Sequence, residues 1–295
     1  MKLWIVVNHF LRNDKFLELE EKFKNAAIEL SVEYEILTNM ECMQIYTPFY
    51  NFDDLRLPDD NNPILFWDKD IMLAKMLEKR GHRVYNNADS IAACDNKIHT
   101  GCLLSGEGID MPVTIPAPFT YENIGYTDKS FLKFVENKLG YPMVVKEAYG
   151  SFGAQVYMAN DFEQLLSVVS NISGEHLYQQ YIKSSHGRDL RLQVVGDKVV
   201  SAMYRYSEND FRANITNGGS MRIYEPNASQ CDIAVKAAKI LGLDFAGVDI
   251  LFGEDEKPVI CEINSNAHFK NIDDCTGSDT AKEIILYILE QETKR

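Results

Sequence analysis

Two short apolar segments near the C-terminal end constrain the fold most, because each carries acidic or amide side chains among residues typical of a core. These segments are 246–251 and 259–264, joined by a short turn. If they pair as an antiparallel hairpin, Asp249 falls close to opposite Glu262. Because side chains alternate between the two faces of a strand, Glu262 and Asn264 share one face. The pattern predicts three oxygen ligands on one surface.

Such a ligand set fits Mg²⁺, which binds a few carboxylate and carbonyl oxygens and takes its remaining ligands from phosphates and water. The alternative is a solvated hairpin face. Two neighbouring carboxylates in an otherwise apolar hairpin repel each other unless a cation compensates them, which favours the metal site.

Composition narrows the class of protein. The chain has 295 residues, 45% of them hydrophobic, which is typical of a globular protein and suggests about two domains. Its net charge of −14 repels phosphate backbones, so nucleic acid is not an expected partner. No stretch approaches the ~20 apolar residues of a membrane span, so no membrane partner is expected. Six scattered cysteines without a C-x-x-C pair indicate a reduced, cytoplasmic protein.

The first ~90 residues alternate between strand and helix patterns, which predicts a parallel sheet covered by helices. From residue 95 the pattern changes to antiparallel strands, including a hairpin with the two-residue turn Gly196-Asp197. Asp95 is the expected N-cap of a helix that reaches Leu104. Predicted strands are 2–8, 33–37, 63–67, 82–85, 143–148, 155–158, 189–195, 198–204, 245–252 and 258–264; the other predicted helices are 14–30, 70–80, 130–139, 161–170, 232–241 and 279–291.

A glycine-bearing loop and a lysine lie together in the central part. Lys146 falls within the apolar strand 143–148, where an anion offsets the cost of burying an ammonium group. The alternative is an edge-strand lysine that reaches water. The loop that follows allows backbone N–H groups to approach phosphate oxygens, although a bare hairpin turn explains it equally well, since neither the P-loop nor the dinucleotide fingerprint is present. Its residues are Tyr149, Gly150, Ser151, Phe152 and Gly153.

The strand at 189–195 alternates polar and apolar residues, so Asp189, Arg191 and Gln193 line one face. An amphipathic surface strand is the alternative. Arginines near one face favour recognition of phosphate or carboxylate, because the guanidinium fork matches both. The neighbouring polar residues are Arg205, Arg212 and Asn214.

Taken in order, these segments resemble the ATP-grasp superfamily, and within it the RimK-type glutamate ligases, from about Asp95 to the C-terminus. The motifs that carry the resemblance are Asp95-Asn96-Lys97, Gly108 to Thr114, Val144-Val145-Lys146, Tyr181-Ile182-Lys183, Gly187 to Arg191, Asp210 to Asn214 with Gly218-Gly219, Ala246 to Leu251, and Glu262-Ile263-Asn264.

The resemblance implies an ATP-grasp fold of α/β and α+β class with an N-terminal Rossmann-like domain. The expected division is 1–94 for that domain, 95–175 for a central subdomain with the phosphate loop, and 176–295 for a C-terminal subdomain with the metal site. It also implies a carboxylate–amine ligase that uses ATP and Mg²⁺, with Mn²⁺ as an alternative, and two metal ions. The expected partners are ATP, a small carboxylate or amino acid, an amine or peptide acceptor, and a second copy of the chain.

The resemblance also assigns roles to residues. Lys97 and Lys146 contact the ATP phosphates, the loop from Tyr149 to Gly153 closes over them, and Asp189 holds the ribose. Arg191 is assigned to the nucleotide site. Gln179, Gln180, Tyr181 and Ile182 line the adenine pocket; Asp249, Glu262 and Asn264 bind the metal; and Arg205, Arg212 and Asn214 stabilise the transferred phosphoryl group.

The chain departs from the RimK-type pattern at two places. Gln180 replaces a common glutamate, and the segment 264–268 lacks the usual proline and glycine while His268 and Lys270 lie nearby. That segment lies beside the substrate in the family, so glutamate is not assumed as the substrate. Candidates for acceptor binding in the first domain are Asn8, His9 and Arg12. A non-catalytic ATP-binding regulatory protein, and a carboxylate kinase, stay open as alternatives.

Overall fold

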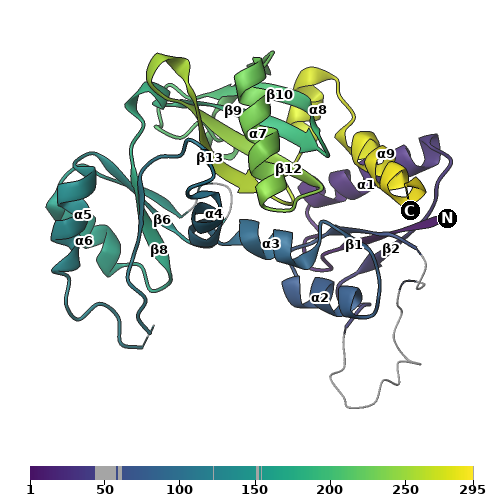
Figure 1. Cartoon of the computed structure of the whole chain (residues 1–295), viewed down its shortest axis with the longest axis horizontal. Coiled ribbons are helices and arrows are strands. Elements are labelled where there is room, and N and C mark those ends of the chain that lie inside the picture. Colours follow the sequence, from purple (N-terminus) through teal and green to yellow (C-terminus); the bar gives the residue numbers. More distant parts are fainter. Residues whose placement is uncertain (44–57, 59–61, 122, 151–152, 154, 295) are drawn as a thin grey trace.

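The computed structural model describes all residues of the chain except 44–57, 59–61, 122, 151–152, 154 and 295. Three sheets follow one another along the sequence (Figure 1), with strand orders β2-β1-β3-β4, β5-β8-β6-β7 and β11-β10-β9-β12-β13. This mixed α/β and α+β architecture agrees with the fold class that the sequence predicts.

The first sheet is parallel throughout, as the strand–helix alternation predicts. In β1 alternate side chains enter different cores: Leu3 and Ile5 pack with α1, whereas Trp4 and Val6 pack with α2. The sheet is therefore buried on both faces, which is typical of parallel sheets. Its elements are β1 (Lys2–Val7), α1 (Asp14–Glu29), β2 (Glu33–Thr38), β3 (Ile64–Trp67), α2 (Ile71–Lys79) and β4 (Val84–Tyr85).

The predicted N-cap at Asp95 is wrong. Asp95 is the last residue of α3 (Ala88–Asp95), and Asn96 caps α4 (Lys97–Leu104). The extended backbone of Asn96 separates the two helices, and its side-chain oxygen accepts hydrogen bonds from the amides of Ile98 and His99 at 2.9 and 3.2 Å. Lys97 is consequently the first residue of α4.

The second sheet is antiparallel and is packed against α5 and α6, at the left of Figure 1. Strand β8 was not predicted, and it pairs with β5 and β6. We therefore propose that the division between the central and C-terminal subdomains follows Gln180 and not residue 175. The elements are β5 (Thr114–Pro116), α5 (Phe131–Leu139), β6 (Met143–Glu147), β7 (Val156–Ala159), α6 (Phe162–Ser170) and β8 (His176–Gln180).

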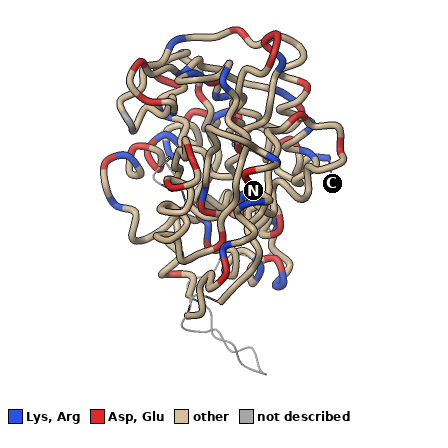
Figure 2. The backbone as a smooth tube through the Cα atoms, turned by 90° about the vertical axis from the view of Figure 1, so that its left-hand side faces the viewer, with Lys and Arg blue, Asp and Glu red and all other residues tan. Residues whose placement is uncertain are grey.

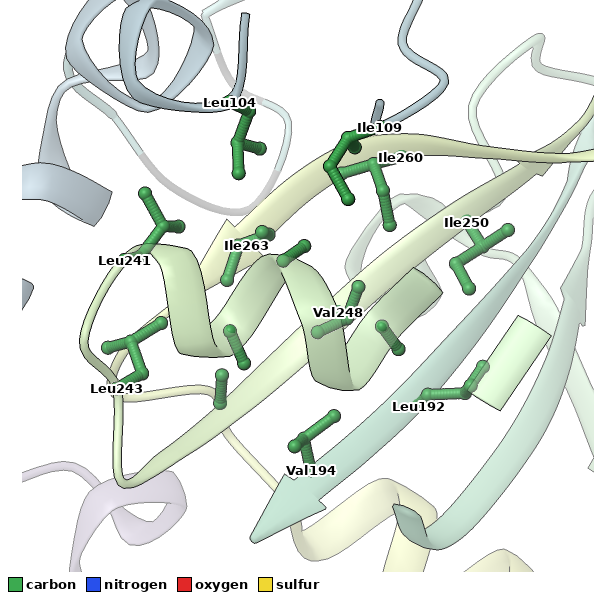
Figure 3. Packing of buried hydrophobic residues seen from close by; sticks show 14 of the residues in the cluster. Leu104, Ile109, Leu192, Val194, Leu241, Leu243, Val248, Ile250, Ile260 and Ile263 are labelled. Carbon is green, nitrogen blue, oxygen red and sulfur yellow. The ribbon is translucent and has the colours of Figure 1, made fainter. Parts of the chain in front are cut away.

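The third sheet carries α7 on one face. Figure 3 shows α7 lying across the strands, above Leu192, Val248 and Ile263. Helix α7 begins at Ala228, earlier than the predicted residue 232, because Asn227 and Gln230 form a reciprocal capping box. The elements are β9 (Arg188–Val195), β10 (Lys198–Tyr206), β11 (Ser220–Ile223), α7 (Ala228–Ile240), β12 (Phe245–Phe252) and β13 (Pro258–Asn264).

The C-terminal helices join the first and third sheets. Ile284 and Ile288 of α9 (Thr280–Thr293) share one buried cluster with Phe23 of α1 and Met203 of β10, and α8 (Lys270–Thr276) contributes Ile272 to the same cluster. This common core fixes the first sheet relative to the face of the third sheet opposite α7, where the polar side chains lie.

Charges of both signs are interspersed along the chain in Figure 2. Among the described residues, no helix is long and apolar enough to cross a membrane.

Candidate active site

A cavity of about 720 Å³ lies where the three sheets meet, and side chains from all three line it. It brings together most of the residues predicted to bind ATP or metal. Those lining it are Lys146, Gly153, Gln179, Gln180, Tyr181, Ile182, Asp189, Arg191, Arg205, Arg212, Asn214, Asp249, Glu262 and Asn264. Lys97 lines an adjoining small cavity with Lys146 and Glu262. Tyr149 and Gly150 are not among the lining residues of either cavity, and Ser151 and Phe152 lie outside the described residues.

The hairpin of β12 and β13 places Asp249 directly opposite Glu262, which confirms the predicted pairing. The register then shifts, so that Ile250 faces Ile260 and Cys261 is the extra residue of a β-bulge. The bulge lets Ile260 and Ile263 both enter the core under α7, while Glu262 faces the cavity.

Asp249 is held by two arginines. The Nε of Arg191 donates to Asp249 Oδ1, its Nη2 donates to Oδ2 at 2.8 Å, and Arg205 Nη2 lies 3.0 Å from Oδ1. Burial raises the pKa of this carboxyl, but the positive charges of Arg191 and Arg205 outweigh that effect and lower the pKa of Asp249 to about 2. Asp249 is therefore ionised at neutral pH.

Asp189 forms the second half of this network. Arg205 donates to both of its carboxylate oxygens, at 2.7 and 2.8 Å, and Asp189 and Arg205 are buried. Burial raises the pKa of Asp189 and the charge of Arg205 opposes that rise. Both residues line the cavity as predicted, but they bind each other first, so the ribose contact of Asp189 stays a prediction.

Lys146 is buried in β6, which has β7 on one side and β8 on the other. The alternative of an edge-strand lysine is therefore wrong. Its ammonium lies 3.6 Å from the sulfur of Cys261. Burial, together with the charge of Lys146, lowers the pKa of Lys97, and Glu262 partly offsets this. Lys97 and Lys146 carry two positive charges close to the single negative charge of Glu262. The net positive charge of these three groups favours binding of an anion.

The glycine-bearing loop rests on two cations. Lys97 Nζ donates to the carbonyl of Gly150 at 3.1 Å, and Arg212 Nη1 donates to the carbonyl of Gly153 at 2.6 Å. Gly150 and Gly153 adopt φ values of 130° and 73°, which other residues rarely adopt. The described ends of the loop thus contact residues predicted to bind phosphate.

The residues predicted to line the adenine pocket lie where β8 ends. Gln179 Nε2 donates to Thr114 Oγ1 at 3.0 Å, and the side-chain oxygen of Gln180 accepts from the amide of Val113 at 3.2 Å. The backbone N–H of Gln180 also donates to the carbonyl of Val113 at 2.8 Å, and the adenine contact of residues 179–182 stays a prediction.

The sequence missed several residues at the opposite end of the cavity, including Lys15, Trp67, Asp68 and Lys69, and it also missed Cys261, which lies beside Lys146. Asn8 lines this end as predicted and donates to Asp68 Oδ1 at 3.0 Å. Burial raises the pKa of Asp68. His9 and Arg12 do not line it. In open α/β sheets, ligands bind outside the carboxyl ends of the parallel strands. Asp68 directly follows β3, so this rule could have predicted it from the sequence.

The side chains predicted to bind metal fit Mg²⁺. Within the described part of the chain, the carboxylate of Glu262 and the amide of Asn264 have no hydrogen-bond or ion-pair partner, and both line the cavity. The same part of the chain holds no group of three or more His, Cys, Asp or Glu placed for a metal. Two carboxylates and one amide suit an ion that takes its other ligands from phosphates and water.

Comparison with known proteins agrees with this geometry. Residues 94–288 match the RimK-like ATP-grasp domain. The Mycoplasma pneumoniae uncharacterized protein MG012 homolog is 32% identical over 253 residues, which are 85% of this chain and 86% of that one. A probable alpha-L-glutamate ligase of Citrobacter koseri is 30% identical over 298 residues, covering 96% of this chain and 95% of that one.

Among solved structures, the ATP-grasp ligase PsnB complexed with a phosphomimetic variant of its minimal precursor, Mg and ADP has a similar fold. The TM-score is 0.70 at 15% identity, over 98% of each chain. The matched domain covers the second and third sheets and every residue predicted to bind ATP or metal. The chain belongs to the RimK-like ATP-grasp family.

Proposed function

We propose that this RimK-like ligase binds ATP in the cavity between the second and third sheets and joins a carboxylate to an amino-acid amine. One observation carries the assignment of the site: the paired strands β12 and β13 bring Asp249, Glu262 and Asn264 into the cavity that Lys146 enters from β6. Acidic oxygens and a buried ammonium group then face one space, which suits a metal-bound triphosphate.

ATP-grasp ligases use ATP and Mg²⁺, and each end of the cavity has a distinct role in our proposal. The adenine lies beside the backbone of 180–182, and the phosphates lie between Lys146 and Lys97. Lys97 and Arg212 bind the carbonyls of Gly150 and Gly153, which ties the described ends of the loop to the cations proposed to bind phosphate.

Asp249, Glu262 and Asn264 are the residues that would hold Mg²⁺. When bound, the ion neutralises phosphate charge and polarises the transferred phosphoryl group. We propose that Arg191 and Arg205 keep Asp249 ionised and in place. We propose that the same ligands hold two such ions.

The reaction proposed here runs through an acyl phosphate. A carboxylate is a poor electrophile, and phosphorylation by ATP gives it a good leaving group. The amine then attacks the carbonyl carbon, an amide bond forms and phosphate leaves. Arg212 and Asn214 line the cavity where negative charge develops, and a guanidinium there stabilises it. Exclusion of water by the loop protects the intermediate from hydrolysis.

Two findings support a proposal for one of the substrates. The Citrobacter koseri relative is named a probable alpha-L-glutamate ligase. In this chain the segment after Asn264 brings His268 and Lys270 to the cavity wall, so we propose an acidic amino acid as one of the two substrates.

The test is release of ADP with Mg²⁺ and ATP against paired pools of acids and amines. A ligase needs both an acid and an amine, whereas a carboxylate kinase releases ADP with the acid alone. Lys146→Met should raise the KM for ATP by about tenfold or more, because a charged hydrogen bond to phosphate is lost. The matched control is Lys198→Met, since Lys198 is an exposed lysine that pairs with Glu283. Bound ATP without ADP release from any pool would support the non-catalytic alternative.

A further inference from the structure

The carboxyl end of β3 presents a buried carboxylate to the cavity. Asp68 directly follows β3, lines the cavity and is only 6% exposed. None of the residues proposed to bind ATP or metal lies in the first sheet, so Asp68 has no role in those contacts. A carboxylate that is removed from water costs free energy unless a partner compensates its charge. The groups around Asp68 therefore indicate what it can bind.

Within the described part of the chain, the groups that bind Asp68 are neutral. The side-chain amide of Asn8 donates to Oδ1 at 3.0 Å and to Oδ2 at 3.3 Å, and the backbone N–H of Lys69 donates to Oδ1 at 2.7 Å. The oxygen Oδ2 thus receives only the longer contact. The ammonium of Lys69 pairs with Asp95 at 2.8 Å, and Asp68 forms no ion pair with any described residue. Its charge is left to a cation that enters the cavity.

Asn8 fixes the direction of these hydrogen bonds. Its Oδ1 accepts from the backbone N–H of Phe10 at 2.9 Å, so its NH₂ group is the part that faces Asp68. Burial raises the pKa of Asp68 and the charge of Asp70 acts in the same direction, while the hydrogen bonds from Asn8 and Lys69 oppose the rise. A carboxylate with a raised pKa holds a proton more readily than an exposed one, which suits a proton acceptor.

The end of β3 is joined to the segment that follows the proposed metal ligands. Asn266, two residues after Asn264, donates from its side chain to the carbonyl of Phe66 at 3.2 Å. The ring of Trp67 stacks on that of Phe245, the first residue of β12, with centroids 5.6 Å apart. These contacts give the residue after Trp67 a fixed place relative to Asn264.

The other side of this turn is joined to the lysine proposed to bind phosphate. Lys69 pairs with Asp95, which ends α3 two residues before Lys97. Burial lowers the pKa of Lys97; Glu262 opposes this effect, and the charge of Lys69 adds to it, so these charged groups lie close together. Asp68 consequently faces the part of the cavity where the metal ligands and the phosphate-binding lysine meet.

We propose that Asp68 binds the amino group of the attacking amine and accepts a proton from it when the amide bond forms. This inference rests on the proposed ligase function and deepens it, because that function requires an amine and assigns no residue to receive it. An ammonium group at Oδ2 of Asp68 donates a charge-assisted hydrogen bond, and bonds of this kind are the strong ones. Asn8 acts as a positioning residue that holds the carboxylate.

The ammonium group binds first and loses one proton to water. The lone pair of its nitrogen then forms the bond to the carbonyl carbon of the acyl phosphate, which makes the nitrogen positive and therefore acidic. One N–H proton moves to Oδ2 of Asp68, while the bond from carbon to the phosphate oxygen breaks and its electron pair leaves with the phosphate. Asp68 returns the proton to the departing phosphate, which leaves as hydrogen phosphate.

Calorimetric titration tests the amine site without turnover. The protein, with Mg²⁺ and a non-hydrolysable ATP analogue present, is titrated with alanine, aspartate and glutamate. Each is compared with the acid of the same size that carries a hydroxyl group in place of the amine, namely lactate, malate and 2-hydroxyglutarate. We expect at least one amino acid to bind about tenfold or more tightly than its hydroxy analogue. Asp68→Asn should weaken binding of that amino acid by about 10- to 100-fold and leave binding of the analogue unchanged.

Hydroxylamine separates the amine step from phosphorylation of the acid. It carries no charge at neutral pH and traps an acyl phosphate as a hydroxamate, so it needs no residue to receive an ammonium group. Succinate, glutarate, aspartate and glutamate serve as the acids. Asp68→Asn should form the hydroxamate at a rate within about threefold of the wild type, with unchanged KM for the acid and ATP. Its rate of amide formation should fall by about 100-fold, as expected when a proton acceptor is lost.

Glu18→Gln is the matched control. Glu18 lies on α1 and lines the same cavity, but its side chain is largely exposed and lies 3.9 Å from the ammonium of Lys270. The substitution removes one negative charge from the same wall, as Asp68→Asn does. Binding of the amino acid and both rates should stay within about twofold of the wild type, because an exposed charge is screened by water.

Four results overturn the amine site. They are that no amino acid binds the wild type more tightly than its hydroxy analogue, that Asp68→Asn weakens both equally or neither, that hydroxamate formation falls as much as amide formation, and that Glu18→Gln causes the same losses. Binding that depends on Asp68, without ADP release or hydroxamate from any acid, supports the amine site and contradicts the ligase. Amide formation that is insensitive to Asp68→Asn supports the ligase and contradicts the amine site.

Discussion

Arg205 donates to both carboxylate oxygens of Asp189 while its Nη2 also lies 3.0 Å from Asp249, so one buried guanidinium links β9, β10 and β12. Asp249, one of the proposed metal ligands, is thereby positioned by residues that do not need to touch the metal. Arg205, which the sequence places at the transferred phosphoryl group, is better explained as a positioning residue.

Replacing Arg205 with methionine should destabilise the protein by about 3–5 kcal/mol, because Asp189 is then left buried without its partner. The free energy of unfolding in urea measures the loss. The control is Lys198→Met on the same sheet, which breaks an exposed pair with Glu283 and should cost less than about 1 kcal/mol. Equal losses in the two variants would show that the buried pair contributes no more than a surface pair.

Replacing Glu262 with glutamine should lower ADP release by roughly 100-fold or more, because a charged group that stabilises the transition state is lost. The amide keeps the size of the side chain, so stability should change little. Turnover is measured against Mg²⁺ concentration, and the variant should need more of the ion. Glu254→Gln, in the exposed turn between β12 and β13, serves as the control. Unchanged turnover with an unchanged Mg²⁺ requirement would remove Glu262 from the metal site.

The pKa of His268, lowered to about 4, predicts a loss of stability in acid. The folded-state pKa lies below the ordinary value of 6.5, so the unfolded chain binds more protons between pH 6.5 and pH 4. Unfolding free energy should therefore fall as the pH drops through this window, by at most about 1.4 kcal/mol per pH unit from this group. Urea unfolding at pH 7, 6 and 5 should show a shallower dependence in His268→Gln than in the wild type; identical slopes would contradict the assignment.

The sequence predicts the elements around the site well because the local signals there are strong. The bounds of β13 were predicted as 258–264 and those of β12 as 245–252, since both are apolar runs ended by turn residues. The opposed positions of Asp249 and Glu262 follow from that pairing. The bulge at Cys261 could not be predicted in this way, because a bulge depends on how the two strands pack against α7 and not on either strand alone.

Strand β8 and the position of Lys15 were also not predicted, because both depend on contacts between distant segments. Strand β8 owes its conformation to pairing with β5 and β6, and its sequence shows no clear alternation. Lys15 reaches the cavity only because α1 packs beside a segment some 250 residues further along the chain, where His268 binds its carbonyl. Contacts between distant segments depend on the assembled sheets, so residue spacing carries no signal for them.

Gly247 provides the last test, because a close approach at this residue sets the substrate end of the cavity. A Cβ at this position would lie 2.3 Å from the Cβ of Ala267 and 3.4 Å from Cδ of Arg191, both of which line the cavity. Gly247→Ala should therefore push the segment 265–268 away from β12 and cost about 1–3 kcal/mol of stability through overpacking.

The same shift should raise the KM for the acid or amine substrate while the KM for ATP stays within about twofold, because the proposed adenine site is at residues 180–182 and not beside Gly247. Steady-state kinetics with each substrate varied in turn separates the two effects. The double variant Gly247→Ala with Ala267→Gly removes the clashing methyl group and should recover most of the lost affinity. A KM change confined to ATP would place the 265–268 segment at the nucleotide and not at the other substrates.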